Sequence, residues 1–288
     1  MKKIIGVILW CTCFNSGLLS QEIKILTWNI FMIPPVIFKS CQTERAFLIA
    51  EYIKNTNADI VVLEESFMES IHDILYKNLH ETYPYQSAVS KSGVLKLNSG
   101  VWILSKYKIE KQDFITYKKK KGSDIFARKG ATYLELNVQH AKLQIIGTHT
   151  QSLPKYREIR ATQFCQLKNE LADRYFQDTI PQFIIGDLNC NYFDTAEYVQ
   201  MQEMLDIQPI RFSGEPYSWN GLKNDLAYTF SEHTLETLDY ILFRKKHARK
   251  AEIISSEILH PYSDSCVCDK KFRYLSDHNP LLSKVLLK

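Results

Sequence analysis

The sequence predicts an α/β (α+β) protein in which two packed mixed β-sheets are flanked by helices, giving a four-layer sandwich. Strand-like runs outnumber helical patterns, two adjacent runs form a hairpin, and several runs are apolar on both faces, as in a covered sheet. No Pro-, Gly- or Ser-rich linker and no internal repeat divides the 288 residues. We therefore expect a single domain over residues 21–288.

Residues 1–20 have the pattern of a secretory signal peptide. Lys2 and Lys3 give a basic start, the run from Ile4 to Phe14 is apolar, and small residues precede Gln21. The apolar run is too short to span about 30 Å of hydrocarbon, which argues against a membrane anchor. The sequence therefore predicts a protein secreted to the extracellular space or the periplasm.

The net charge of the chain argues against a nucleic-acid partner. Without Lys2 and Lys3 the formal net charge falls from +4 to +2, which is weak for a protein that binds duplex nucleic acid. We expect a monomer with no stable nucleic-acid partner.

Five of the seven cysteines follow residue 20, and this odd number leaves at least one thiol free or intermolecular. Cys266 and Cys268 are too close together for the usual zinc knuckle.

Eight runs are predicted as strands. In chain order they are residues 23–28, 60–63, 101–105, 132–138, 143–148, 183–185, 238–243 and 281–287. In the fourth run, Leu134, Leu136 and Val138 alternate with more polar residues, which indicates one apolar face. The fourth and fifth runs form the hairpin, with its turn near residues 139–141.

Helical periodicity is present between some of these runs, at residues 42–55, 68–79 and 156–175. In the first, Ala46, Ile49, Ala50 and Ile53 follow the spacing of one helix face. Thr43 is the candidate N-cap. We interpret the apolar stripes of all three helices as core packing.

Acid, amide or imidazole groups end four of the apolar runs. These ends are Leu26-Thr27-Trp28-Asn29, Gly147-Thr148-His149, Gly186-Asp187-Leu188-Asn189 and Leu275-Ser276-Asp277-His278. Strands that end on such groups place them at one rim of a sheet. Two histidines with several carboxylates and amides at one rim predict metal-assisted attack on a phosphate ester.

Hydrolysis of a phosphodiester requires a cation, a base and an acid. Magnesium prefers oxygen ligands, which Asn29 and Glu65 supply. Histidine suits the base because its pKa lies near neutral pH. His278 is the candidate base, provided that two strands bring Asp239 beside it, and His149 is the candidate acid.

Asp187 and Asn189 are alternate residues, so we expect them to share one face of a strand. There they would orient water and hydrogen-bond the charged transition state. Each of these residues alone is weak evidence for a catalytic site, because a single histidine at a strand end is more often structural. The combination in this order is far more specific.

The ordered set resembles the endonuclease/exonuclease/phosphatase superfamily, which includes pancreatic deoxyribonuclease. The matching motifs are residues 26–29, 62–65, 148–149, 186–189, 238–240 and 276–278. Within it, the chain is most similar to the bacterial secreted sphingomyelinases, a phospholipase C activity. That closer match includes residues 42–46, 52–55, 65–67, 121–124, 129–130, 146–151 and 236–241.

The resemblance implies a deoxyribonuclease-like fold and a Mg²⁺-dependent enzyme, with Mn²⁺ or Co²⁺ as other divalent cations. Its expected substrate is a sphingolipid membrane surface, on which it would hydrolyse sphingomyelin to ceramide and phosphocholine. The implied metal-site residues are Asn29, Glu65 and Asp277. The implied catalytic residues are His149, Asp187, Asn189, Asp239 and His278, and Phe67 and Asp124 match positions near the substrate head group.

Three departures from the family pattern bear on these roles. Glu64 replaces the common Gln or Asn, and it would either add a ligand or point into the structure. Asn98 and Ser99 replace an acidic pair of a peripheral second metal site, which we do not expect here. Residues 260–275 lack the Trp of the hairpin that dips into the membrane in the bacterial enzymes.

The run of four lysines at residues 118–121 has two interpretations. One is a solvated loop, and the other is attraction to anionic lipid, worth about 1 kcal/mol per residue near the surface.

Three other functions are compared with the pattern. A secreted Mg²⁺-dependent deoxyribonuclease would use the same catalytic residues, but the near-neutral charge and the lack of a basic-aromatic cluster argue against it. A non-enzymatic toxin or adhesin would lack a catalytic group, and all the expected groups are present. An inositol phosphatase is disfavoured, because Leu238-Asp239-Tyr240 lacks the Cys-Asp-Arg pattern of that branch.

Overall fold

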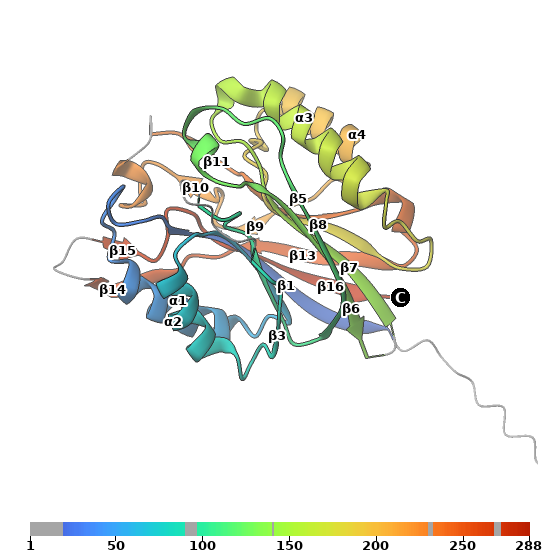
Figure 1. Cartoon of the computed structure of the whole chain (residues 1–288), viewed down its shortest axis with the longest axis horizontal. Coiled ribbons are helices and arrows are strands. Elements are labelled where there is room, and N and C mark those ends of the chain that lie inside the picture. The colour runs from blue at the N-terminus through green and yellow to red at the C-terminus, as the bar shows by residue number, and fades with distance from the viewer. Residues whose placement is uncertain (1–19, 90–96, 140, 230–232, 268–271) are drawn as a thin grey trace, which may run out of the picture.

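Two β-sheets packed face to face, with helices on both outer sides, confirm the predicted fold class (Figure 1). The structure is a computed structural model that describes residues 20–89, 97–139, 141–229, 233–267 and 272–288. The predicted signal peptide lies outside the described residues, except for its last position. No helix in the described ranges has the length and apolar character needed to span a bilayer.

The first sheet has seven strands in the order β3-β4-β2-β1-β16-β13-β9. In that order they are β3 (Tyr85–Gln86), β4 (Trp102–Ser105), β2 (Ile60–Ser66), β1 (Gln21–Met32), β16 (Leu281–Leu287), β13 (Ala251–Ile258) and β9 (Ser213–Gly214). The central strand β1 runs parallel to β2 and antiparallel to β16. Its register pairs Asn29 with Glu64, so Asn29 lies beside the carboxyl end of β2.

The second sheet has five strands in the order β12-β8-β7-β6-β5. They are β12 (Asp239–Phe243), β8 (Gln182–Asp187), β7 (Ala141–His149), β6 (Gly130–Val138) and β5 (Lys108–Thr116). Val138 pairs with Ala141, which confirms the predicted hairpin, while residue 140 of its predicted turn lies outside the described residues. His149 pairs with Asp187, and Asp187 pairs with Asp239, so the three residues form one row across the sheet.

Helices α1 (Gln42–Thr56) and α2 (Glu69–Leu79) lie on one side of the sandwich, and α3 (Arg157–Leu167) and α4 (Thr195–Leu205) lie on the other (Figure 1). The predicted α1 and α2 are confirmed. The Thr43 cap is wrong, because Cys41 occupies the N-cap in a left-handed conformation without a side-chain hydrogen bond. The third predicted helix is interrupted, since α3 passes into a π-helical turn η3 (Lys168–Ala172) and ends short of Tyr175.

Short elements connect these layers. Two small hairpins are β10 (Trp219–Asn220) with β11 (Leu235–Glu236), and β14 (Tyr262–Val267) with β15 (Phe272–Tyr274). The 3₁₀ turns are η1 (Gly122–Phe126), η2 (Pro154–Tyr156), η4 (Ala227–Thr229) and η5 (Lys245–His247). Residues 260–275 therefore contain a hairpin, β14–β15, although they lack Trp.

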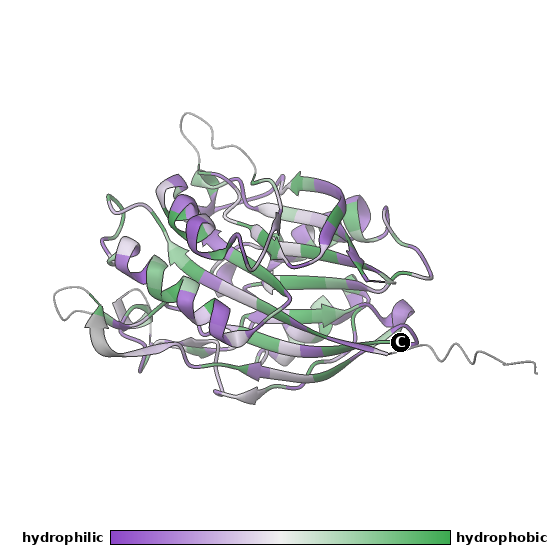
Figure 2. Cartoon of the chain, turned by 90° about the horizontal axis from the view of Figure 1, so that it is seen from below, coloured by the Kyte–Doolittle hydropathy of each residue, from purple (hydrophilic) through white to green (hydrophobic). Residues whose placement is uncertain are grey.

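Apolar side chains hold the strand ends in place. The main cluster includes Ile25 and Val62 of the first sheet and Leu134 and Ile145 of the second, all fully buried. A second cluster lies between the first sheet and α1 and α2. Figure 2 shows the apolar residues concentrated along the stacked strands. Because interiors pack as densely as organic crystals, this core fixes the polar groups at the strand ends.

The cysteines confirm the expectation of an unpaired thiol. Cys41 is disulfide-bonded, whereas Cys165 and Cys190 are free, the first exposed and the second buried.

Candidate active site

His278 and Asp239 form the hydrogen-bonded pair that the sequence predicts. His278 Nδ1 lies 2.8 Å from Asp239 Oδ2, and its Nε2 lies 3.8 Å from Asp187 Oδ2. Burial disfavours the charged ring, but the carboxylates of Asp239 and Asp187 prevail and raise the pKa of His278 well above its ordinary value. With Nδ1–H donated to Asp239, Nε2 faces the remaining site residues.

Two tryptophans fix the position of His278. Trp28 Nε1 donates a hydrogen bond to the His278 carbonyl oxygen at 2.9 Å. The edge of the Trp219 ring packs against the imidazole, with centroids 5.1 Å apart. Sequence alone does not point to Trp219, because the residue with which it forms an isolated β-bridge, His278, is 59 positions away in the chain.

His149 lies on the other side of Asp187 and has a different electrostatic environment. Its Nε2 is 3.4 Å from Asp187 Oδ2 and 2.8 Å from Lys129 Nζ. Burial first, and the nearby Lys129 charge second, lower the pKa of His149 well below its ordinary value. The imidazole is therefore neutral at pH 7, and its Nε2 accepts a hydrogen bond from the Lys129 ammonium.

Lys129 is a site residue to which sequence reasoning assigned no role. Its buried ammonium contacts His149, the Thr150 carbonyl oxygen at 3.0 Å and Asp124 Oδ2 at 3.1 Å. A lysine beside a strand-initiating glycine looks like a surface residue in sequence. The available signal was its place within a segment, Lys129-Gly130, that matches the sphingomyelinases.

The two predicted head-group residues lie in different surroundings. The Asp124 carboxylate is buried and pairs with Lys129, and it accepts hydrogen bonds from Ser152 N at 2.8 Å and Ser152 Oγ at 3.2 Å. Phe67 is nearly buried and packs tightly against Gly100. The structure therefore links Asp124 to His149 through a single lysine, and a contact of either residue with substrate remains a prediction.

Asn29 joins the two sheets at the site. Its Nδ2 donates to Asp187 Oδ2 at 3.1 Å, and its Oδ1 accepts from the Phe31 backbone N–H at 3.1 Å. Beside it, Glu65 has a left-handed backbone with φ of 53° and is partly exposed. Burial raises the pKa of the Glu65 carboxyl, while Lys129 and His278 oppose the rise.

Asp277 completes a concentration of acid groups. Burial, with repulsion from Glu65, raises its pKa to about 7 against the opposing effect of His278. Burial and the Asp239 carboxylate likewise raise the pKa of Asp187 to about 6, again against His278. Arg45, which sequence reasoning gave no role in the site, is a fully buried cation near Asp277 and Glu65. Several carboxylates that repel one another in a buried site are a donor set suited to a divalent cation.

Two groupings of these donors are possible. Asp187, Asp239 and His278 offer ligand atoms within 4.8 Å of one another. However, His278 Nδ1 already donates to Asp239, and this hydrogen bond is the arrangement of a base and its orienting carboxylate. The oxygen atoms of Glu65, Asn29 and Asp277 are not committed to the imidazole, and these three residues remain the predicted cation ligands.

Glu64 points into the structure. It is fully buried between the sheets, where Thr27 Oγ1 donates to its Oε1 at 2.8 Å. Burial, followed by repulsion from Asp239, raises the pKa of Glu64 well above its ordinary value. Glu64 is thus a buried structural carboxyl group whose protonated form is favoured by burial.

Asn189 lies beyond the end of its strand, so the alternation of side chains along a strand does not determine its position. Strand β8 ends at Asp187, and Asn189 adopts φ of 49°. Its backbone N–H donates to Asp187 Oδ1 at 2.9 Å, and its Nδ2 donates to the Thr150 carbonyl oxygen at 3.3 Å. Alternation was therefore the wrong reason to place Asn189 beside Asp187, although the two residues are in contact.

Known sequences match this chain across the site. A profile of the Endonuclease/Exonuclease/phosphatase family matches residues 26–278. Sphingomyelinase C 2 of Leptospira interrogans is 34% identical over 257 aligned positions, in an alignment that covers 79% of this chain but only 40% of that protein. A phospholipase C of Staphylococcus aureus is 29% identical over 291 residues, covering 90% of this chain and 86% of that protein.

Solved structures share the fold. Beta toxin from Staphylococcus aureus superposes with a TM-score of 0.83 at 28% identity, covering 91% of this chain and 99% of that chain. A variant of the same toxin with bound magnesium ions has a TM-score of 0.82 at 28% identity, covering 93% of this chain and 100% of that chain. Truncated TDP2 from Caenorhabditis elegans, at 19% identity and a TM-score of 0.67, covers 93% of this chain and 98% of that chain and shows likeness of fold alone.

The residues of the candidate site lie within the range that matches the family. The matched range includes every predicted site residue from Asn29 to His278. Asn29, Glu65, His149, Asp187 and Asp239 among them lie at the adjoining ends of strands from both sheets. The chain is an enzyme of the endonuclease/exonuclease/phosphatase family.

Proposed function

We propose that the chain is a Mg²⁺-dependent phosphodiesterase of the phospholipase C type that hydrolyses sphingomyelin to ceramide and phosphocholine. The observation that supports it most is the pairing of His278 with Asp239 beside Asp187, in one buried site with Asn29 and His149. The names of the relatives, sphingomyelinase C and phospholipase C, supply the substrate class.

His278 is the general base of this proposal. Asp239 holds its Nδ1–H, so Nε2, once deprotonated, takes the proton from water, and the same carboxylate stabilises the imidazolium that forms. A divalent cation held by Glu65, Asn29 and Asp277 would neutralise charge on the phosphoryl oxygens. Asp187 and Asn189 orient the water and the phosphoryl group.

Positive charge on the leaving-group side comes from Lys129. His149 is neutral and accepts the Lys129 hydrogen bond, so the imidazole orients the Lys129 ammonium, which is the proton-bearing group of this pair and would face the phosphate. Burial removes competing water and strengthens these interactions.

A substrate panel tests the proposal. Purified protein is assayed on sphingomyelin, phosphatidylcholine, lysophospholipid and plasmid DNA, with chelator and after addition of Mg²⁺, Mn²⁺ or Co²⁺. We expect Mg²⁺-restored release of phosphocholine from sphingomyelin, lost in His278→Ala and kept in His80→Ala, a histidine on the exposed end of α2. Cleavage of DNA with all phosphocholine lipids left intact would overturn the proposal in favour of a deoxyribonuclease.

Secretion is part of the same proposal and has its own test. The N-terminal sequence of the protein is determined from the culture medium and from the periplasm of cells expressing the full chain. A mature N-terminus at Gln21 is expected. Retention of the complete chain in the cytoplasm contradicts it.

A further inference from the structure

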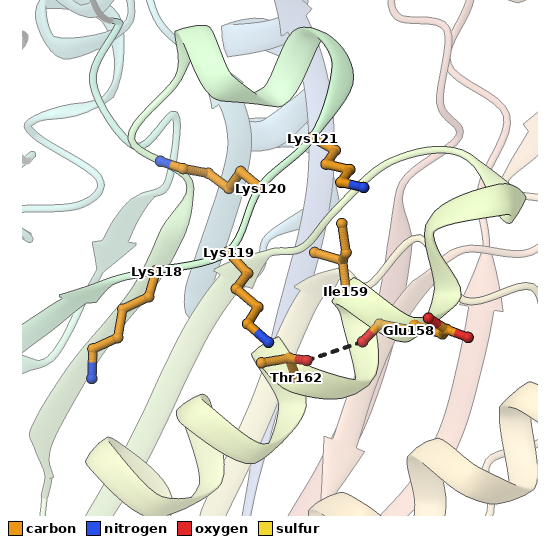
Figure 3. Close-up of a pocket in the computed structure, with 7 residues that line it drawn as sticks. All are labelled: Lys118, Lys119, Lys120, Lys121, Glu158, Ile159 and Thr162. Atoms are coloured by element: carbon orange, nitrogen blue, oxygen red, sulfur yellow. Dashed lines mark hydrogen bonds between the residues drawn. The ribbon is translucent and has the colours of Figure 1, made fainter.

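Four consecutive lysines form an exposed loop beside the active site. In this lysine loop, Lys118–Lys121, the side chains of Lys119 and Lys121 extend toward α3 and line an open pocket there (Figure 3). Lys118 pairs with Glu170 at 2.6 Å, and Lys120 Nζ donates to the Ala127 carbonyl oxygen at 2.7 Å. Among the described residues, the ammonium groups of Lys119 and Lys121 have no such partner. Two positive charges are therefore available to a ligand.

Glutamine side chains hold the backbone of the lysine loop. Gln151 accepts from Lys121 N at 2.8 Å and donates to Lys121 O at 3.0 Å. Gln163 donates to Lys119 O at 2.8 Å, and Gln166 accepts from Lys118 N at 3.1 Å. Gln151 and Gln163 are buried. The loop is thus fixed on α3 and on the segment after β7, unlike a freely solvated loop, and its charges have a defined position.

Exposed apolar side chains lie next to these charges. Ile125 and Phe126 follow the lysine loop in η1 and are 44% and 62% exposed, and Leu153 is 48% exposed. Ser152, the neighbour of Leu153, hydrogen-bonds Asp124, the neighbour of Ile125. Ile125, Phe126 and Leu153 together form what we call the apolar tip. Water contact disfavours such side chains, so a cluster of them indicates a contact surface.

The same contacts connect this surface to the chemistry. Asp124 pairs with Lys129, which contacts His149, and Gln151 is two residues beyond His149. A partner that binds the lysine loop and the apolar tip would therefore lie next to the active site.

We propose that the lysine loop and the apolar tip dock the enzyme on an anionic lipid bilayer. Basic residues attract anionic head groups at the surface, and apolar side chains enter the boundary between head groups and acyl chains. A nucleic acid would satisfy the lysines but leave Ile125 and Phe126 without a favourable contact. The inference builds on the proposed lipid substrate, since it identifies the surface that brings this substrate to His278.

Vesicle sedimentation in EDTA tests the surface without hydrolysis. Vesicles of phosphatidylcholine are compared with vesicles that also contain about 30% phosphatidylserine. The wild type is expected to partition at least about tenfold more strongly to the anionic vesicles, and salt at about 0.5 M is expected to abolish the difference. Lys119→Gln with Lys121→Gln should lower anionic binding about fivefold per lysine. Ile125→Ser with Phe126→Ser should weaken binding to both kinds of vesicle.

Matched control variants carry the same kinds of substitution outside the lysine loop and the apolar tip. Lys245→Gln with Arg249→Gln removes two exposed charges beyond the far end of β12, and Ile254→Ser removes an isoleucine on β13 that is 51% exposed. These variants should bind vesicles as the wild type does. Equal loss in controls and surface variants overturns the proposal, as does unchanged vesicle binding in surface variants that lose DNA binding. Thermal unfolding midpoints verify that each variant is folded.

The outcomes separate this inference from the proposed function. A protein that hydrolyses sphingomyelin in detergent micelles but does not distinguish anionic from neutral vesicles keeps the enzymatic function and loses the docking surface. A protein that binds anionic vesicles through these residues but cuts no phosphocholine lipid keeps the surface and loses the enzymatic function.

Discussion

At the residue scale, His278 and His149 are chemically distinct because of their neighbours. Carboxylates of Asp239 and Asp187 overcome the effect of burial and raise the pKa of His278. Burial and the Lys129 ammonium lower the pKa of His149. Two imidazoles on either side of Asp187 thus have opposite proton affinities, and His278 must release its Nε2 proton before it can act as the base.

The first prediction concerns the orientation of His278. Asp239→Asn keeps the shape but replaces the acceptor of the Nδ1–H bond with an amide, which favours the wrong tautomer. Activity (kcat/KM) on micellar sphingomyelin should fall by on the order of 10³-fold or more, by analogy with a His-orienting aspartate elsewhere. Asp178→Asn, on the exposed segment before β8, should leave activity unchanged. A fall of less than tenfold in Asp239→Asn would show that Asp239 does not orient the base.

The second prediction concerns Lys129 and the proton affinity of His149. Because the folded pKa of His149 is lowered, the unfolded chain binds more protons below about pH 6.5, and this group makes stability fall as pH drops through that range. Lys129→Met removes the adjacent charge and should raise the pKa of His149, although burial still opposes protonation. In Lys129→Met, His149 should therefore contribute less to the loss of stability on acidification.

NMR titration of the His149 ring protons measures this pKa directly. Lys245→Met, far from the site on η5, is the control and should leave the His149 titration where it is. An identical His149 pKa in Lys129→Met and the wild type would refute the electrostatic role of Lys129.

At the element scale, the strand ends predicted the site and the register explains why. The apolar runs ending in His149, Asp187 and Asp239 are adjacent strands β7, β8 and β12, so their last or first residues align in one row. This alignment requires only that neighbouring strands pair. Sequence could not supply the position of Lys129, because its approach to His149 depends on how the segment before β6 folds over the sheet edge.

The elements that the sequence missed have weak periodic signals. Strand β5 contains Lys108, Glu110, Lys111 and Gln112 and is largely exposed, so its character comes from pairing with β6. Strand β13 is interrupted by a bulge between Ile253 and Ser255, which breaks the two-residue alternation. In both, tertiary pairing decides the conformation and local preference does not.

The third prediction concerns the close approach of β7 and β8. Gly186 has φ of 139°, and a Cβ there would lie 1.9 Å from the Thr148 carbonyl oxygen, a backbone atom that cannot move alone. Gly186→Ala should lower the free energy of unfolding by roughly 3 kcal/mol or more. It should also reduce activity, because it displaces Asp187.

Gly147→Ala is the matched comparison on the neighbouring strand. Its added Cβ would meet only the ends of the Ile103 and Val62 side chains at 3.0 Å, which can shift. Its cost should be smaller, about 1 kcal/mol. Chemical denaturation of both variants measures the difference, and equal losses would contradict the backbone clash at Gly186.

At the scale of the whole molecule, each sheet contributes part of one site. Asn29 and Glu65 come from the first sheet, and Asp187 comes from the second. Asn29 bridges them through its hydrogen bond to Asp187. A cation held among these carboxylates would relieve the repulsion between the two sheets, so its binding should stabilise the entire sandwich.

The fourth prediction follows from this linkage. The pKa is raised by burial to about 6 for Asp187 and to about 7 for Asp277. Folded carboxyl groups with raised pKa values bind more protons than the unfolded chain, so their contribution to stability is lost as pH rises from about 4 to 7. Protons and a divalent cation compete for the oxygens of Asp277 and Glu65, whose pKa values are both raised, and the stabilisation by Mg²⁺ should therefore be larger at pH 8 than at pH 5.

Thermal unfolding with EDTA and with Mg²⁺ at the two pH values measures this difference. A cation at about 100 times its Kd adds about 2.7 kcal/mol, which corresponds to roughly 5 °C or more in Tm. Glu65→Gln should remove most of that increase at pH 8, whereas Glu203→Gln on the exposed side of α4 should keep it. A cation-induced increase that is equal at both pH values, or that survives Glu65→Gln, would mean that the ion binds outside the carboxylates that join the two sheets.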